Sequence, residues 1–323
     1  MNVLRTIAKA IYLGAVALSL GATPSVAQDY PSAPIKWLLP YGAGGDTDTV
    51  ARLLAEDLAK RLGQPVVVEN RPGGNSIIAL QALMSATPNG YTIMTVPYDS
   101  LTVTPYIDPN AKYNIDTDFE YVGAYARFPM LLVTRKDFPA NDAREVFDLI
   151  RKSDGDLTHT SFGAGSASQI MMAMLVKRLG GKVTPVVYPG AGQAGVDLLG
   201  GRVDFHVAGV PAVISHVTSG TLKPIAWMGN DVNPVLPDVP SLADAGVENY
   251  EFLNWQGVIA PKGTPADVVA KLSEALQATM SDPGIQKALA DRGVDPFYLA
   301  PAEFRSFVAT QNTKMKAEIE SGV

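Results

Sequence analysis

Apolar and polar positions along this chain change period repeatedly, from the pattern of a strand to that of a helix and back. The first complete unit is the stretch 37–70. It opens with Trp37-Leu38-Leu39, a short apolar run typical of a buried strand, which ends at Pro40. A glycine-rich segment at 41–45 follows, and then apolar residues recur at helical spacing to Leu62, before Gly63 and Pro65. This pattern predicts strand, glycine loop, helix and strand, with Asp46 or Thr47 as the helix cap.

The same alternation continues along the chain and predicts an α/β fold with largely parallel sheets. Three helices with marked starts, at Pro265, Pro283 and Pro301, close it. We interpret the whole as two lobes, the first built from residues 28–125 and 231–323 and the second from 126–230. The further strands are expected at 91–96, 121–126, 130–134, 158–162, 183–188, 202–208 and 222–228. The segment 98–100 follows one of them, at the strand end where open α/β sheets bind ligands.

The glycine loops suggest what the lobes hold. Gly42, Gly44 and Gly45 let consecutive backbone N–H groups converge just before a helix N-terminus, where the helix dipole favours an anion. A tight turn that needs glycine only for its backbone angles is the alternative. Similar loops recur at 73–74, 163–165 and 190–192. If the lobes face each other, three or four N–H bonds to a carboxylate, at roughly 1.5–3 kcal/mol each, supply much of the ~8 kcal/mol of a micromolar complex.

The N-terminus predicts export. Arg5 and Lys9 precede an apolar run at 10–22, and Ser25-Val26-Ala27 are small residues suited to cleavage before Gln28. Residues 1–27 are therefore expected to be a secretory signal peptide, with the mature chain beginning at Gln28. The chain has no cysteine, hence no disulfide and no lipid-attachment site. We expect a bacterial periplasmic protein.

Charge and side-chain inventory narrow the function. Removing Arg5 and Lys9 leaves 24 basic residues against 32 acidic ones, so the net charge changes from −6 to −8. No basic patch stands out, which argues against nucleic acid as a partner. An anion site must therefore be made by local dipoles.

No catalytic set is evident, and we expect no enzyme activity, metal or cofactor. His206 and His216 are ten residues apart without a carboxylate at ligand spacing, and Ser166 does not lie in a G-x-S-x-G motif. Gly190, Gly192 and Gly195 match G-x-G-x-x-G, but the acidic residue expected roughly 20 positions later is missing from a strand end.

Several motifs in order resemble one known family. They include PYGAGGDTDTVARLLAEDLAKRLGQPVVVENRPGG from Pro40, SFGAGSAS from Ser161, VYPGAG from Val187, DLLGGRVD from Asp197, LPDVPSLADAG from Leu236 and WQGVIAPKGTP from Trp255. Together they resemble the tripartite tricarboxylate transporter receptors, the Bug-type periplasmic binding proteins. The resemblance implies a two-lobed type II binding protein that captures a small organic carboxylate. Its usual partner is a membrane permease of large and small subunits, and we expect a monomer.

The resemblance also implies a site. Its two loops supply the carboxylate-binding residues Tyr41, Gly42, Ala43, Gly44, Gly45, Gly163, Ala164, Gly165, Ser166 and Ser168. A second group at expected cleft positions consists of Tyr98, Phe162, Tyr188, His206, Ala208 and Trp255. The rings in this second group favour an aromatic mono- or dicarboxylate. Simple packing of each ring against neighbouring loops is the alternative for every one of them.

Departures from the family pattern bear on the ligand. Ala208 and Gly209 stand where family members often carry an aspartate, so a ligand ammonium group would lack its counter-charge, which disfavours amino acids. Asn75 and Ser76 replace further glycine, and Gln169 replaces a common histidine. An aliphatic di- or tricarboxylate such as citrate, a sensor that signals to a membrane kinase, and a periplasmic hydrolase or dehydrogenase remain as alternatives.

Overall fold

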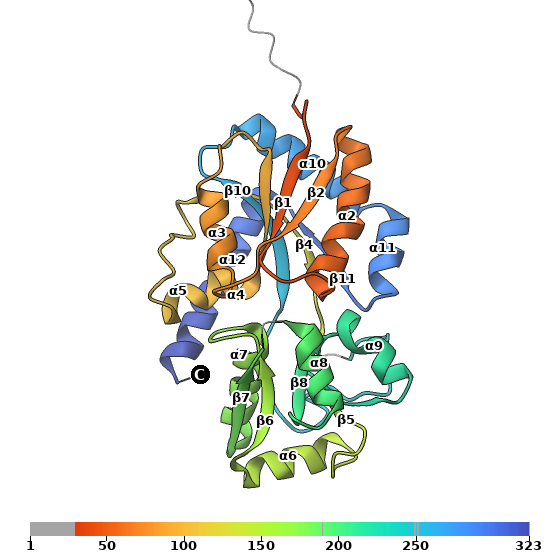
Figure 1. Ribbon diagram of the computed structural model, residues 1–323. Helices are drawn as coiled ribbons and strands as arrows, with labels where there is room; N and C mark the ends of the chain where they lie inside the picture. The colour runs from red at the N-terminus through yellow and green to blue at the C-terminus, as the bar shows by residue number, and fades with distance from the viewer. Residues whose placement is uncertain (1–29, 189, 231, 249, 251, 323) are drawn as a thin grey trace, which may run out of the picture. The chain divides into compact units, whose positions relative to one another are not determined.

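Two mixed sheets, each flanked by helices, form the two lobes of the protein (Figure 1). The computed structural model describes residues 30–188, 190–230, 232–248, 250 and 252–322, of which those from 33 onward belong to one compact unit. The predicted signal peptide and its cleavage site lie outside the described residues.

The first sheet has six strands in the order β2-β1-β3-β10-β4-β11. Strand β1 pairs in parallel with β2 and β3, whereas β10 runs antiparallel between β3 and β4, and β11 lies antiparallel at the edge. The strands are β1 (Ile35–Leu39), β2 (Val66–Asn70), β3 (Thr92–Pro97), β4 (Phe119–Arg127), β10 (Trp255–Pro261) and β11 (Asp295–Leu299). Its helices are α2 (Asp46–Leu62), α3 (Ile77–Met84), α4 (Tyr98–Thr102), α5 (Thr104–Ile107), α10 (Ala266–Met280), α11 (Pro283–Ala290) and α12 (Pro301–Glu320).

The second sheet repeats this plan with five strands in the order β7-β6-β8-β5-β9. Here β6 pairs in parallel with β7 and β8, and β5 is the antiparallel strand. The strands are β5 (Met130–Arg135), β6 (Asp154–Ser161), β7 (Lys182–Val187), β8 (Phe205–Gly209) and β9 (Leu222–Trp227). The helices are α6 (Ala143–Lys152), α7 (Ala167–Leu179), α8 (Ala191–Leu199) and α9 (Val210–Thr218).

Strands β5 and β10, which run antiparallel to their neighbours, each enter their sheet directly after the chain crosses between lobes. The chain passes from β4 to β5 through residues 128–129, and returns from β9 to β10 through 228–254. The alternating pattern predicted the parallel pairs, but these crossing strands make both sheets mixed rather than largely parallel. The two crossings agree with a lobe change near the expected positions, and the domain limits themselves stay a prediction.

Local signals explain where the helices start and stop. Helix α2 begins after Gly45, whose extended backbone makes it the N-cap, so neither Asp46 nor Thr47 caps it as predicted. Gly63 ends it in the left-handed conformation (φ 69°) that glycine adopts without strain. Helix α12 starts at Pro301, and the Glu303 carboxylate accepts a hydrogen bond from the Ala300 N–H at 3.1 Å.

Some elements differ from the expectation. Strands β6 and β8 begin at Asp154 and Phe205 rather than at 158 and 202, and the segment 98–100 opens α4 instead of remaining a loop. Helices α5, α6 and α9 were not expected, and neither were strands β10 and β11, because the pattern predicts no strand after the run at 222–228. Helix α6 carries a cap signal, since Asp142 accepts a hydrogen bond from the Glu145 N–H at 2.9 Å.

A chain of buried polar contacts fixes the start of α2 against the first sheet. The Trp37 indole donates to Thr95 at 3.0 Å, and the Thr95 hydroxyl lies 3.2 Å from that of Tyr125. Tyr125 donates to Gln256 at 2.5 Å, and Gln256 donates to Thr47 at 2.6 Å. Burying a polar group without a partner costs free energy. This series of hydrogen bonds therefore holds the first turn of α2 in one place, at the end of the sheet that faces the second lobe.

Candidate functional site

The first predicted loop, 41–45, lies between β1 and α2 and already holds a carboxylate of the chain itself. Asp48 accepts hydrogen bonds from the Gly44 N–H at 3.0 Å, from Arg52 at 2.8 Å and from Asn70 at 2.9 Å. Asn70 also donates to the Tyr41 carbonyl at 3.0 Å. Burial raises the pKa of Asp48, but the bonds from Arg52, Gly44 and Asn70 outweigh it, so the pKa ends below its usual value.

The second predicted loop, between β6 and α7, is tied together by serine hydroxyls. The Phe162 N–H donates to Ser166 at 3.2 Å, and the Gly163 N–H donates to Ser161 at 3.1 Å. Ser161 in turn donates to Gln169 at 2.9 Å, and the hydroxyls of Ser166 and Ser168 lie 3.4 Å apart. Gln169, noted as a departure from the family pattern, is therefore part of the loop's internal support.

This second loop packs directly on the first lobe. Gly165 has φ 76°, and a Cβ added there would lie 2.2 Å from Cδ1 of Ile107 and 3.0 Å from Cγ1 of Val103. Only glycine accommodates both the backbone angle and this close approach. The loop predicted to bind the ligand is thus one of the surfaces on which the lobes meet.

Asp99 extends from the first lobe to the start of α7. Its carboxylate, 1% exposed, accepts bonds from the Tyr41 hydroxyl at 3.1 and 3.2 Å and from the Ser100 N–H at 2.9 Å. The backbone amide of Ala167, the first residue of α7, also acts on it. Burial raises the pKa of Asp99 to about 6, although these three donors oppose the shift. Burial, followed by the Asp99 charge, raises the pKa of Tyr41 well above its usual range.

Asp46 makes the corresponding contact with α9. A Cβ at Gly209 would lie 1.9 Å from Oδ2 of Asp46, so the carboxylate occupies the space that any other side chain at 209 would take. The residue is partly exposed as a whole, but its Oδ1 is enclosed and has no hydrogen-bond partner among the described residues. Burial raises the pKa of Asp46 to about 7, and the Ala212 amide opposes the shift.

Sequence reasoning missed Asp46, Asp99 and their polar neighbours as site residues. The hydroxyls of Ser76 and Ser100 are fully buried and have no partner of normal geometry within the described part of the chain. Asn75 and Ser76 adopt left-handed backbone angles, φ 44° and 77°, that side chains rarely take. The sequence did contain signals for these residues. The segment 98–100 follows a predicted strand at its ligand-binding end, and Asn75 and Ser76 depart from the family pattern.

The second group of predicted residues divides between packing and the cleft. Tyr98 and Trp255 are buried edge to face at 6.1 Å between ring centroids, and Trp255 also packs on Phe304 at 5.4 Å. Ala208 lies in the core of the second lobe, where it pairs with Leu131 of β5. These three residues support the lobes rather than face the two loops.

The remaining three of that group lie in the second lobe. The Tyr188 hydroxyl donates to Asp197 of α8 at 3.1 Å, so its polar end is already engaged within the second lobe. His206 is hydrogen-bonded to Thr160, and burial, together with His159, lowers the pKa of His206 to about 4. Phe162 is half-buried and meets the His206 ring edge to face at 6.0 Å. Of the six, Phe162 is the one that belongs to a predicted carboxylate loop.

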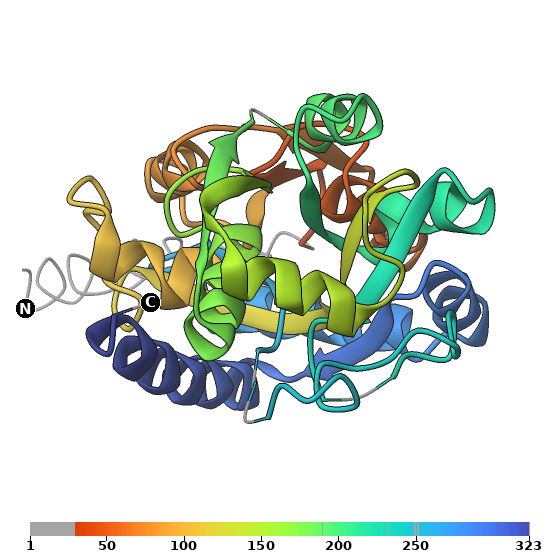
Figure 2. The ribbon, with the colours of Figure 1, turned by 90° about the horizontal axis from the view of Figure 1, so that it is seen from below.

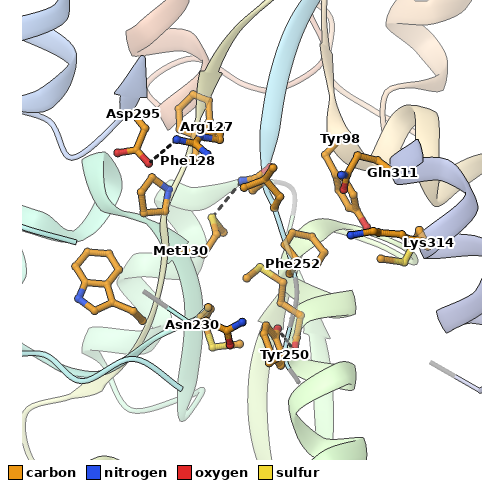
Figure 3. A pocket seen from close by; sticks show the side chains of 18 of the residues that line it. Tyr98, Arg127, Phe128, Met130, Asn230, Tyr250, Phe252, Asp295, Gln311 and Lys314 are labelled. Atoms are coloured by element: carbon orange, nitrogen blue, oxygen red, sulfur yellow. Dashed lines mark hydrogen bonds and ion pairs between the residues drawn. The ribbon is translucent and has the colours of Figure 1, made fainter. Parts of the chain in front are cut away.

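A cavity of about 910 Å³ lies elsewhere, around the segments that connect the lobes (Figure 3). Its lining combines both crossings, at Phe128 and Phe252, with Gln311 and Lys314 near the end of α12. Helix α12 also reaches the second lobe there, since Arg178 of α7 pairs with Glu318 at 3.3 Å (Figure 2). Tyr98 is the one residue of the predicted sets that lines this cavity. We place the candidate site at the loops, where the glycines and buried carboxylates meet, and not at this cavity.

Two lobes of like topology, joined by two crossings and meeting at glycine loops, define a two-lobed solute-binding protein. The family model described as the tripartite tricarboxylate transporter family receptor matches residues 50–322, and the chain belongs to this family. Within the described residues no helix is both long and apolar enough to cross a bilayer, and no three histidine, aspartate or glutamate side chains group as metal ligands.

Solved structures agree with this assignment. The periplasmic binding protein BugD is 33% identical, with 90% of this chain and 98% of that one covered and a TM-score of 0.85. Rpa4515 of R. palustris, solved with adipate, is 27% identical over 90% and 97% of the two chains, with a TM-score of 0.86. MatC of Rhodopseudomonas palustris, solved with bound malate, is 29% identical over 89% and 99%, with a TM-score of 0.84.

Proposed function

We propose that the protein is a periplasmic solute receptor that captures a small organic carboxylate between its lobes and delivers it to a membrane permease of large and small subunits. The observation that carries this proposal is the direct meeting of the lobes at the predicted loops. Gly165 approaches Ile107 closely, and Asp46 fits against Gly209. The family and the relatives solved with adipate and malate support the carboxylate, and the predicted signal peptide supports the periplasm.

Backbone N–H groups at the helix starts are the expected donors to the ligand. The chain's own aspartates already accept hydrogen bonds from some of them. The Gly44 N–H donates to Asp48, and the Ala167 N–H donates to Asp99. The ligand carboxylate is therefore assigned to the other N–H groups and hydroxyls of the loops 42–45 and 163–168, without those of Gly44 and Ala167. Each such bond to a charged group contributes roughly 1.5–3 kcal/mol net.

An aromatic acid was the sharper prediction, and an aliphatic acid the alternative. The packing of Tyr98 and Trp255 leaves Tyr41 and Phe162 as the rings nearest to the loops. Two rings favour a planar ligand less than six would, so the proposal is stated for small organic carboxylates, and both classes enter its test.

The test is a thermal-shift screen of the mature protein against aromatic acids, aliphatic di- and tricarboxylates and amino acids. A ligand that binds only the folded state adds about 2.7 kcal/mol of stability at a hundredfold excess over its Kd. Calorimetry on each positive compound then gives affinity, and its recovery unchanged by NMR distinguishes a receptor from an enzyme. If no carboxylate raises the melting temperature, the proposal is refuted.

A further inference from the structure

Two carboxylates where the lobes meet, those of Asp46 and Asp99, are not neutralised by any lysine or arginine that the structure describes. Asp48 is paired with Arg52 at 2.8 Å. Asp46 and Asp99, by contrast, form no ion pair with a lysine or arginine in the part of the chain that is described, and no such residue contributes to the pKa of either. Backbone N–H groups at the starts of two helices act on these acids instead, that of Ala212 in α9 on Asp46 and that of Ala167 in α7 on Asp99. Buried polar atoms are normally paired, and Oδ1 of Asp46 has no hydrogen-bond partner among the described residues, so this oxygen is free to accept a donor from outside the chain.

Asp46 occupies the position at which a family acid was missing. The sequence places Ala208 and Gly209 after β8, without the aspartate that could pair with a ligand ammonium group. In the folded protein, the Asp46 carboxylate from the other lobe lies in the space above Gly209. Its enclosed Oδ1 has no partner among the described residues. Asp46 can therefore supply the counter-charge that a ligand ammonium group would need.

Asp99 restricts what else the ligand can carry. It already acts as the anion at the start of α7, through Ala167, and Tyr41 donates to it. Among the described residues, the buried polar atoms close to Asp99 in sequence or contact that lack a partner include the hydroxyls of Ser76 and Ser100, and none of them carries a positive charge. A second ligand carboxylate would thus meet two acids and no cation, which costs free energy in an enclosed site.

From this arrangement, and resting on the proposed function, we infer that the ligand carries one carboxylate and one ammonium group, and that Asp46 is the specificity-determining residue that pairs with the ammonium. The glycine loops bind the carboxylate end, and Asp46 accepts hydrogen bonds from the other end. The receptor then rejects dicarboxylates because Asp46 and Asp99 repel their second charge.

The experiment compares acids of matched length that differ at one end. β-Alanine is measured against succinate, γ-aminobutyrate against glutarate, and para-aminomethylbenzoate against terephthalate, by calorimetry at about pH 8, where every ammonium group is still charged. The proteins are the wild type, Asp46→Asn, and Asp137→Asn as a control at a side chain that is 85% exposed. Circular dichroism verifies that all three are folded.

We expect at least one amino member to bind the wild type and Asp137→Asn tighter than its dicarboxylate counterpart. Asp46→Asn should weaken that binding by about ten- to a hundredfold, the effect of one hydrogen bond to a charged group, and remove the preference. A wild type that prefers the dicarboxylates overturns this inference and leaves the proposed function standing. A preference for ammonium that survives in Asp46→Asn overturns the role of Asp46. If neither class binds, the proposed function fails, and the inference fails with it.

Discussion

We expect Asp46 to make closure of the unliganded protein sensitive to pH. Its carboxylate lies against Gly209 of the other lobe, and burial there raises its pKa from 3.8 to about 7, so separating the lobes would expose it and return the pKa toward 3.8. A raised acid pKa means that the closed form holds a proton more tightly than the open form. The contribution of Asp46 to closure is therefore complete below pH 3.8 and is lost as the pH rises to about 7.

The magnitude follows from the two pKa values. With 3.8 for the open form and about 7 for the closed form, raising the pH from about 5 to about 8 disfavours closure by roughly two pK units. That is about a hundredfold in the equilibrium, or about 2.6 kcal/mol. Asp99, whose pKa is about 6, adds up to about tenfold in the same direction. His159 and His206, with pKa values of about 4, remain neutral throughout.

The assay is a distance measurement between the lobes without ligand. Because the chain has no cysteine, Glu56→Cys on α2 and Arg144→Cys on α6, both exposed, give one specific label pair. The separation should lengthen between about pH 5 and about pH 8 in the wild type, and much less in Asp46→Asn. An equal change in the two proteins, or none in the wild type, would show that Asp46 does not control closure.

Three further substitutions test the contacts that build the site. Tyr41→Phe removes the hydrogen bond to Asp99 and should lower the free energy of unfolding by about 1.5–3 kcal/mol in urea titrations above pH 6; a loss below 0.5 kcal/mol would contradict the pairing. Gly165→Val should abolish carboxylate binding in calorimetry, because its Cβ would meet Ile107 at 2.2 Å, whereas Gly195→Ala in α8, outside the loops and with nothing within 4 Å, should bind normally. Trp255→Ala should lower the free energy of unfolding by about 3–5 kcal/mol in the same titrations, because this ring is buried. A loss of ligand affinity without a loss of stability would instead show that the Trp255 ring contacts the ligand.

Asp46 would connect closure of the lobes with ligand capture. Near neutral pH an ionised Asp46 opposes closure, and an ammonium group beside it would remove that penalty. A ligand shifts such an equilibrium only through its differential affinity for the two forms, and pairing with Asp46 supplies a difference of that kind.

The sequence by itself determined the repeating units of this fold. Apolar runs ended by proline, such as Trp37 to Pro40, and helices ended by glycine, such as Gly63, are local signals that backbone geometry enforces, so the strands, glycine loops and most helices were predictable. The ordered motifs identified the family. The sequence could not show that β5 and β10 enter their sheets antiparallel, because strand direction depends on where the chain crosses.

Only the tertiary structure showed which residues come together at the candidate site. Asp46 and Gly209 lie far apart in the sequence and in different lobes. They come into contact because the start of α2 and the end of β8 meet where the lobes face each other. Trp255 and Tyr98 looked suited to a cleft but pack on each other, since ring burial depends on neighbours that no local pattern encodes. Local sequence fixes backbone conformation, whereas the charge balance between the lobes is set by side chains brought together from distant positions. Here these include Asp46 and Asp99, which no lysine or arginine in the described part of the chain neutralises.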